Sequence, residues 1–181
     1  MIADLGLLAA RVVVGGGMAA HGAQKAFGWF EGPGPEGAAS FMESLGFKPG
    51  ATYATAASYG ELTAGLLIAI GAGGPLGPAA LIAVQAVAQT SVHAKNGFFA
   101  AKGGIELGTV YCAAALALAS NGYGAISFDR LFGLEQGLRR PALSMLALAG
   151  AAAAAYVVLG RRDFSPPPGT LAEPTLRGDR S

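Results

Sequence analysis

PALSMLALAGAAAAAYVVLG, residues 141–160, is a run of apolar and small residues without a charged side chain. Arginines flank it on both sides, Arg139 and Arg140 before it and Arg161 and Arg162 after it. A helix needs about 20 mainly apolar residues to cross the hydrocarbon core of a bilayer, and arginines at its ends can reach the two polar interfaces. The stretch therefore predicts a membrane-spanning helix.

The composition of the whole chain indicates the same class of protein. Hydrophobic residues make up 52% of the chain and charged residues 13%, whereas a soluble domain carries about 25% charged residues. The net charge is +1, so the chain has no excess of basic residues with which to neutralise the phosphates of a nucleic acid. We therefore predict a multi-pass protein of the cell membrane, embedded in a lipid bilayer, with no nucleic-acid partner.

Four further apolar segments lie before residues 141–160 in the chain. They cover residues 4–27, 51–72, 76–95 and 104–120. We expect an all-α fold, a transmembrane four-helix bundle with an additional fifth transmembrane helix at 141–160. Glycine and alanine are frequent in these segments, which permits close approach between membrane helices.

The links between the segments divide the chain into three parts. Residues 28–50 form a long link in which Phe41 and Leu45 have helical spacing, and this predicts a short interfacial helix between the first two spans. We expect a four-helix membrane core over 1–128 and a connector with the fifth helix over 129–160. The proline-rich stretch 161–181 predicts a disordered tail.

Ionisable residues inside or at the ends of apolar segments are the strongest functional signal, because such groups are costly in hydrocarbon. These residues are Arg11, His21, Lys25, Glu61, His93 and Glu106. In an up-down bundle the first span ends, the second begins, the third ends and the fourth begins on one side of the membrane. We call that side the rim, and it is expected to collect His21, Lys25, His93, Asn96, Lys102 and Glu106.

Polar residues on the third predicted span recur at helical spacing. Gln85, Gln89 and His93 are each four residues apart and predict one polar stripe. A stripe facing lipid would leave polar groups unsatisfied at a cost of several kcal/mol each, so we expect it to face the bundle interior. The alternative for Gln85, Gln89 and Thr109 is a structural role as polar contacts between helices.

Arg11 and Glu61 are candidates for a buried ion pair between the first two spans, with either a structural or a functional role. Cys112 is the only cysteine, so the chain alone cannot run a dithiol cycle or ligate an iron–sulfur cluster. Any redox chemistry then needs a bound cofactor or a partner. Two imidazoles and a carboxylate would suit zinc or iron, but the sequence has no HExxH-type spacing, and we predict no metal site.

Several short strings together resemble a known family. After Arg11 and Gly15 the chain carries HGAQKAFGWF at 21–30, GEL at 60–62, HAKNGFF at 93–99 and GGIEL at 103–107. In this order, over about residues 5–128, they resemble the DoxX family of bacterial and archaeal membrane proteins. The resemblance implies a four-helix membrane bundle, and the founding member of the family is a small subunit of a thiosulfate:quinone oxidoreductase. The fifth span and the tail depart from that pattern.

Two functional hypotheses follow. In the first, the chain is a subunit of a quinone-linked oxidoreductase system, with no intrinsic cofactor and with electrons supplied by a soluble or membrane partner protein. Histidine and glutamate at membrane depth suit proton delivery to a quinone. The expected catalytic residues are His21, His93, Glu106 and Glu61. The expected quinone-binding residues are His21, Gln24, Lys25, Gln89, His93 and Asn96.

In the second hypothesis the chain is a non-enzymatic membrane anchor or assembly subunit, or a conduit for a small solute. Its rim charges would then hold a soluble partner or line a passage, and a homo-oligomer is a further form of assembly to consider. The sequence does not decide whether the chain is itself an enzyme.

Overall fold

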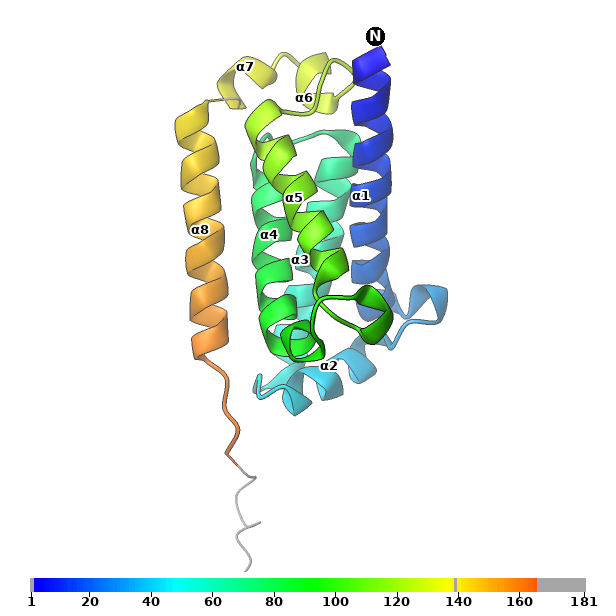
Figure 1. Ribbon diagram of the computed structural model, residues 1–181, viewed down its shortest axis with the longest axis vertical. Helices are drawn as coiled ribbons and strands as arrows, with labels where there is room; N and C mark the ends of the chain where they lie inside the picture. The colour runs from blue at the N-terminus through cyan, green and yellow to red at the C-terminus, as the bar shows by residue number, and fades with distance from the viewer. Residues whose placement is uncertain (1, 139, 166–181) are drawn as a thin grey trace, which may run out of the picture.

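The computed structural model describes residues 2–138 and 140–165, and the described chain is helical with no β-strand (Figure 1). Four helices run up and down in succession and form the bundle: α1 (Ile2–Phe27), α3 (Gly50–Ile70), α4 (Leu76–Ala88) and α5 (Glu106–Asn121). A fifth long helix, α8 (Pro141–Gly160), packs along α4 at the edge of the bundle. The all-α bundle is therefore confirmed.

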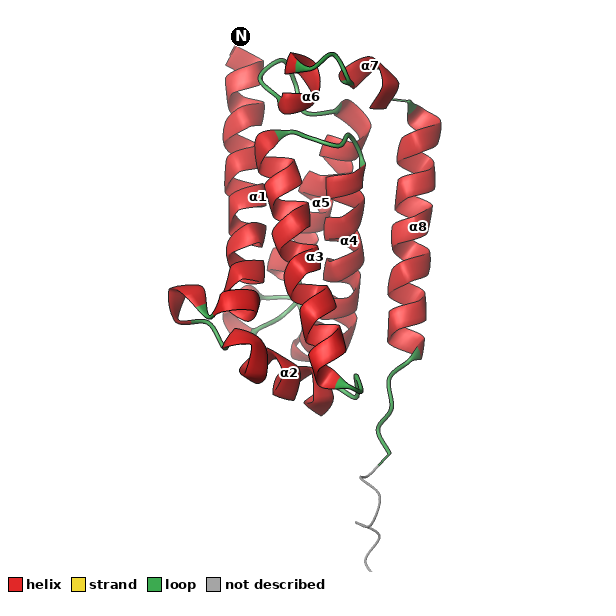
Figure 2. Cartoon of the chain, turned by 180° about the vertical axis from the view of Figure 1, so that it is seen from behind, coloured by secondary structure: helices red, strands yellow, loops and turns green. Residues whose placement is uncertain are grey.

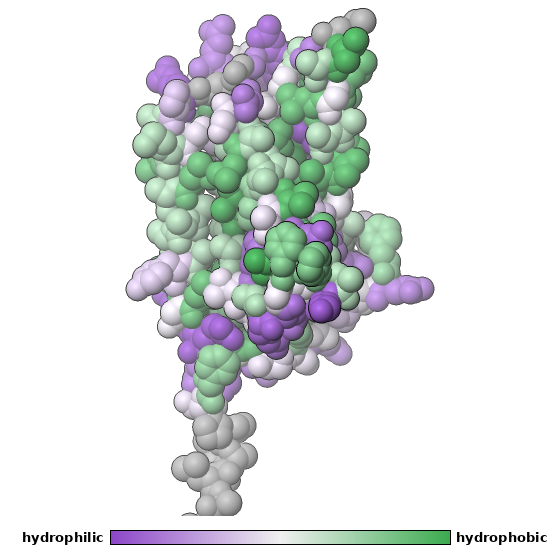
Figure 3. Space-filling view, viewed as in Figure 1, coloured by the Kyte–Doolittle hydropathy of each residue, from purple (hydrophilic) through white to green (hydrophobic). Residues whose placement is uncertain are grey.

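The outer surface has the distribution of apolar residues that a bilayer requires. Figure 3 shows an apolar belt along the middle of one face, with polar residues gathered at both ends. Large apolar side chains such as Val13 and Leu146 are exposed. Among the described helices, α1 and α8 are long and apolar enough to cross a membrane, whereas the regular α-helical parts of α4 and α5 have 13 and 16 residues. The structure thus supports a membrane protein. That the chain crosses the membrane five times remains a prediction.

The third predicted span is helical throughout, but its hydrogen-bond pattern changes near the rim. A π-helical turn, η2 (Gln89–His93), and a 3₁₀ turn, η3 (Ala94–Asn96), continue α4. π-Helical turns inside α-helices are rare and occur frequently at functional sites. The turn alters the direction of the side chains at its end and beyond, beginning with His93.

The predicted short helix between the first two spans is present as α2 (Gly34–Ser44), preceded by a 3₁₀ turn, η1 (Trp29–Glu31). Helix α2 lies across the rim end of the bundle, where α1 ends and α3 begins, and packs on α3 (Figures 1 and 2). A further 3₁₀ turn, η4 (Ala100–Lys102), belongs to the rim loop between η3 and α5.

The opposite end of the bundle is closed by the connector that carries α6 (Phe128–Leu131) and α7 (Glu135–Leu138). Asp129 is buried there, and its carboxylate accepts hydrogen bonds from the backbone N–H groups of Gly73 at 2.9 Å and Gly74 at 2.7 Å. This carboxylate ties the connector to the α3–α4 turn, a role that the sequence did not reveal.

The beginning of the predicted tail is ordered, which corrects the expectation of disorder from residue 161 onward. Arg162 donates a hydrogen bond from Nε to the Leu45 carbonyl at 2.9 Å, and its guanidinium lies 5.5 Å from the centre of the Phe47 ring. The Asp163 N–H donates to the Gly46 carbonyl at 2.6 Å. The remainder of the predicted tail, 166–181, lies outside the described residues.

Helices α1 and α3 approach closely because glycines line their contact. A Cβ added at Gly15 would lie 2.5 Å from the Gly65 carbonyl oxygen and 2.6 Å from the Ala69 nitrogen. A Cβ added at Gly22 would lie 2.5 Å from the Leu62 nitrogen. The contact therefore fixes an antiparallel register in which residue 22 lies opposite residue 62, and residue 15 opposite residue 69.

We expect Gly15→Ala to lower the free energy of unfolding by about 1–3 kcal/mol, because the added methyl group collides with the α3 backbone. Gly16→Ala is the matched control, since that glycine is exposed and its Cβ would meet nothing within 4 Å. The control should be neutral or stabilising, because alanine favours a helix by up to about 1 kcal/mol over glycine. Thermal unfolding in mild detergent checks both variants, and equal melting temperatures would contradict the close packing.

Candidate functional site

A cavity of about 520 Å³ lies inside the rim half of the molecule. Side chains of α1, α3, α4, α5 and α8 line it, together with α2 and the link that follows α2. Most of the lining is apolar and includes Met18, Met42, Phe47, Val84, Leu107 and Val158. Its volume falls within the range of about 300–1,000 Å³ typical of small-molecule sites.

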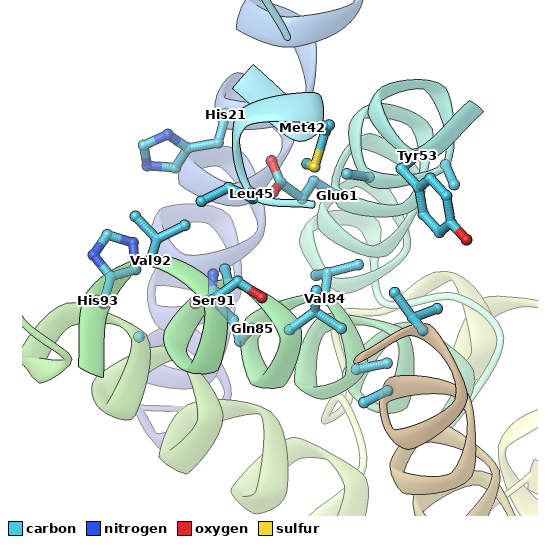
Figure 4. Close-up of a pocket in the computed structure, with 18 of the residues that line it drawn as sticks. His21, Met42, Leu45, Tyr53, Glu61, Val84, Gln85, Ser91, Val92 and His93 are labelled. Atoms are coloured by element: carbon cyan, nitrogen blue, oxygen red, sulfur yellow. The ribbon is translucent and has the colours of Figure 1, made fainter. Parts of the chain in front are cut away.

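The polar groups of the cavity gather toward one end. Figure 4 shows His21 and His93 on the same side of the cavity, with Glu61, Ser91 and Gln85 between them and the far wall. The sequence predicted that His21 and His93 would share the rim. The structure brings both of them to the same cavity and adds Glu61.

An ion pair connects α1 and α3 at this polar end. Lys25 Nζ lies 2.5 Å from Glu61 Oε2, and the Glu61 side chain is only 10% exposed. The same Nζ donates to the His21 carbonyl oxygen at 3.1 Å. His21 Nδ1 lies 3.3 Å from Gln24 Oε1, so Gln24 orients the imidazole without lining the cavity itself.

The predicted Arg11–Glu61 pair is wrong, because the register of α1 against α3 separates the two residues. Glu61 lies opposite the turn of α1 around Gly22, and Arg11 is eleven residues earlier, about 16 Å along the helix. Arg11 is instead buried near the other end of the bundle, where Nη2 donates to the Ile126 carbonyl at 2.5 Å. Its guanidinium lies 5.7 Å from the centre of the Tyr123 ring, and burial raises the pKa of that phenol, which therefore stays neutral.

Two of the predicted site residues, Asn96 and Glu106, stabilise the rim loop and do not line the cavity. Asn96 Nδ2 donates to the Gly103 carbonyl at 3.1 Å, and Glu106 Oε2 accepts from the Ala100 N–H at 2.8 Å. The sequence placed them correctly at the rim, but local loop hydrogen bonds direct their side chains away from the cavity.

His93 contacts both the rim loop and the cavity. Its Nδ1 lies 2.7 Å from the Gly103 carbonyl oxygen. A carbonyl can only accept, so Nδ1 carries the proton, and on a neutral ring Nε2 is left as an acceptor. His93 can therefore accept a hydroxyl proton from a ligand, and it can donate to a ligand carbonyl once the ring is protonated.

The predicted polar stripe on the third span divides into two parts. Gln85 lines the cavity, with Nε2 at 3.8 Å from Met18 Sδ. Gln89 turns toward α5, where Nε2 lies 3.6 Å from Cys112 Sγ and Oε1 accepts from Thr109 at 3.4 Å. These contacts favour the structural role for Gln89, and they give no support to its predicted part in binding a quinone.

Ser91 is a cavity residue that the sequence reasoning missed. It is 8% exposed, and its Oγ has no hydrogen-bond partner among the described residues. A hydroxyl within an apolar run, two residues before His93, was the available signal. Tyr53, Phe47 and Tyr111 were also missed; their contacts depend on the path of the α2–α3 link and on the depth of α5.

The described residues contain no group of three or more histidine, cysteine, aspartate or glutamate side chains arranged to hold a metal ion. Glu106, which was weighed together with the two histidines, binds the Ala100 N–H instead. The donor set of the cavity therefore consists of imidazole, hydroxyl, amide and the Lys25–Glu61 pair.

We expect Lys25→Met to lower the free energy of unfolding by about 3 kcal/mol, because it leaves the Glu61 carboxylate buried without its cation. The double variant Lys25→Met/Glu61→Gln should recover most of the loss, since no charge then remains at the pair. Lys95→Met, at an exposed position outside the cavity, is the control and should change stability by at most about 0.5 kcal/mol. Thermal unfolding measures all three, and a double variant as unstable as the single one would show that pairing is not the cause.

Comparison with known proteins adds one finding. The DoxX family model matches residues 6–94. No curated protein and no solved structure matches the chain. The match includes His21, Lys25, Glu61 and His93 and ends before the rim loop and α8, so it is shorter than the resemblance over 5–128 predicted. Over residues 6–94, the chain belongs to the DoxX family.

Proposed function

We propose that this chain is a quinone-binding subunit of a membrane oxidoreductase system, located in the cell membrane with several membrane passes. The family match indicates a membrane protein linked to oxidoreductase-type systems. The observation that carries the proposal is the cavity, whose apolar walls lead to a polar end formed by His21, His93 and the Lys25–Glu61 pair. A quinone has the same division, with polar carbonyl oxygens on an otherwise apolar body.

The donor set at the polar end fits the two carbonyl oxygens of a quinone. The Ser91 hydroxyl is buried and has no hydrogen-bond partner in the described part of the chain, which is costly unless a ligand or water accepts its proton. A carbonyl oxygen is an acceptor that matches it. The fit therefore rests on an unsatisfied donor as well as on the volume of the cavity.

Proton delivery is the chemistry that the chain itself would contribute. The bound group supplies a two-electron couple, and its reduction consumes two protons. His93 Nε2 and the exposed His21 ring connect the polar end with the rim surface, and the Lys25–Glu61 pair holds a further exchangeable proton. The electrons would come from a partner redox protein, since the proposal gives this chain no electron carrier of its own.

A conduit for a small solute fits less well. Beyond the cavity, toward the end that carries α6 and α7, the bundle interior is filled by side chains such as Ile68 and Leu81, both fully buried. A packed core of this kind favours a site that binds over a passage that conducts. A non-catalytic anchor stays the competing function, and it predicts no quinone affinity.

We expect His93→Ala to weaken the binding of a soluble quinone analogue about tenfold, as the loss of about 1.4 kcal/mol implies. His93 also holds the Gly103 carbonyl, so the variant disturbs the rim loop as well. Asn96→Ala is the matched control, because it removes the other side-chain donor to the same carbonyl without touching the cavity. Titration of the purified protein in mild detergent gives both affinities.

If His93→Ala and Asn96→Ala lower the affinity for the quinone analogue equally, the effect comes from the rim loop, and His93 does not contact the ligand. A wild-type protein that binds no quinone analogue would overturn the proposal itself and leave the anchor as the better function.

Ser91→Ala should separate ligand binding from stability. Without ligand, the variant should unfold at the wild-type temperature or above it, because the lost hydroxyl had no partner in the described chain. With a quinone analogue, the affinity should fall about five- to tenfold, since one hydrogen bond to the ligand is lost. Thermal unfolding and titration on the same preparation test the pair of effects. A variant that is destabilised and binds normally would show that Ser91 has a hidden structural partner.

A further inference from the structure

We propose that the α8 end of the cavity is a slot for the isoprenoid tail of the quinone, and that it opens sideways to lipid between α3 and α8. This inference rests on the proposed function and adds the class of ligand, a long-tailed quinone instead of a small water-soluble one. It follows from where the cavity runs, from what lines each end, and from how α8 is attached.

The cavity extends across the bundle from one flank to the other. Figure 4 shows His21 and His93 on one side of it, and Tyr53 with the α8 ribbon on the other. Lining residues are exposed at both sides: His21 and Leu107 at the polar end, Ala56 and Ala154 at the α8 end. A ligand held between these ends therefore meets the surface in two places.

The α8 end has the chemistry of a channel for a hydrocarbon chain. Apart from Tyr53, the residues of α3 and α8 that line it are Ala56, Ala57, Ala154, Ala155 and Val158. These five are small, apolar and uncharged, so they leave room for a chain and offer no side-chain hydrogen bond. A peptide or a charged tail would have most of its polar groups unsatisfied in this slot.

Helix α8 leaves this side of the bundle open. It packs along α4, with a minor contact to α5, and α3 is not among its main neighbours (Figures 1 and 2). The end of α8 is held at the rim through Arg162, which stacks on Phe47, and Phe47 in turn lies 5.2 Å from the Tyr53 ring. Both aromatic rings line the cavity, so the attachment of α8 fixes the position of the slot wall.

The tail of the ligand is a better occupant than the acyl chain of a phospholipid. The slot is continuous with the polar end at His21 and His93, so a molecule with its ring at the histidines has its tail directed to α8. A phospholipid acyl chain entering from the same side would offer no acceptor to Ser91 or the histidines, because its polar headgroup stays at the membrane interface.

Tail-directed photolabelling of the wild-type protein tests this placement without any variant. The probe is a benzoquinone ring with a four-isoprene tail that carries a diazirine at its far end. The label should fall on peptides containing 53–57 of α3 and 154–158 of α8. Label concentrated on α1 or α5 would overturn the slot. So would a phospholipid with a diazirine in its acyl chain that labels the same peptides and is not displaced by the tailed quinone.

A blocking substitution gives a second, independent readout. In Ala154→Trp the indole should fill the mouth of the slot. The affinity for the tailed benzoquinone should fall at least tenfold, whereas the affinity for the tail-less ring should stay within twofold of the wild-type value. Ala153→Trp is the control, because Ala153 is exposed on the same helix and does not line the cavity, and it should bind both probes as wild type does.

The two probes distinguish failure of the slot from failure of the proposed function. If Ala154→Trp binds both probes as wild type does, the tail leaves the cavity elsewhere and the slot is overturned, although quinone binding stands. If wild type binds neither probe, the proposed function fails, and this inference fails with it.

Discussion

The close packing of α1 on α3 is the constraint on which the rest of the site depends. Glycines at 15, 22 and 65 let the two backbones approach, and this fixes one register between the helices. That register places Lys25 beside Glu61 at the rim. In a low-dielectric surrounding, the buried Glu61 carboxylate requires the half-buried Lys25 ammonium, so the pair in turn holds the register. The geometry of the polar end is therefore set by residues that have no side chain.

The π-helical turn at the end of α4 is the second determinant of the site. A regular α-helix would place Gln85, Gln89 and His93 on one face. With the turn, Gln89 contacts Cys112 and Thr109 on α5, whereas Ser91 and His93 line the cavity. The stripe is thus divided between a helix-packing contact at Gln89 and cavity contacts at Gln85 and His93, with the π-helical turn between Gln89 and His93. The DoxX match ends at residue 94, one residue after this turn.

The sequence predicted the helices, the short helix at the rim and the sharing of the rim by His21 and His93, because each depends on local periodicity and on the alternation of an up-down bundle. It did not predict the partner of Glu61. Choosing between Arg11 and Lys25 requires the offset of two antiparallel helices, which depends on the glycine contacts between α1 and α3 and not on hydropathy. Asn96 and Glu106 were assigned to the site for a similar reason: hydrogen bonds of the rim loop, invisible in the pattern, decide where their side chains point. The stretch around Arg162 was predicted to belong to the tail, because the residues that it contacts, Leu45 and Phe47, lie far from it in the sequence.

The cavity combines two parts of the chain that the family match separates. Its histidines and ion pair belong to residues 6–94, whereas α8 supplies part of its apolar wall from outside the match. Under the proposed function, proton exchange would depend on the first part and the fit of a hydrophobic ligand on both. Substitutions on α8 would then change which ligand the cavity accepts without altering the groups that carry protons. Attachment of α8 through Arg162 to Phe47, itself a cavity residue, means that the added helix and the bundle position the same wall. Under the proposed function, a helix at the edge of the bundle would thus determine ligand selectivity while taking no part in the chemistry.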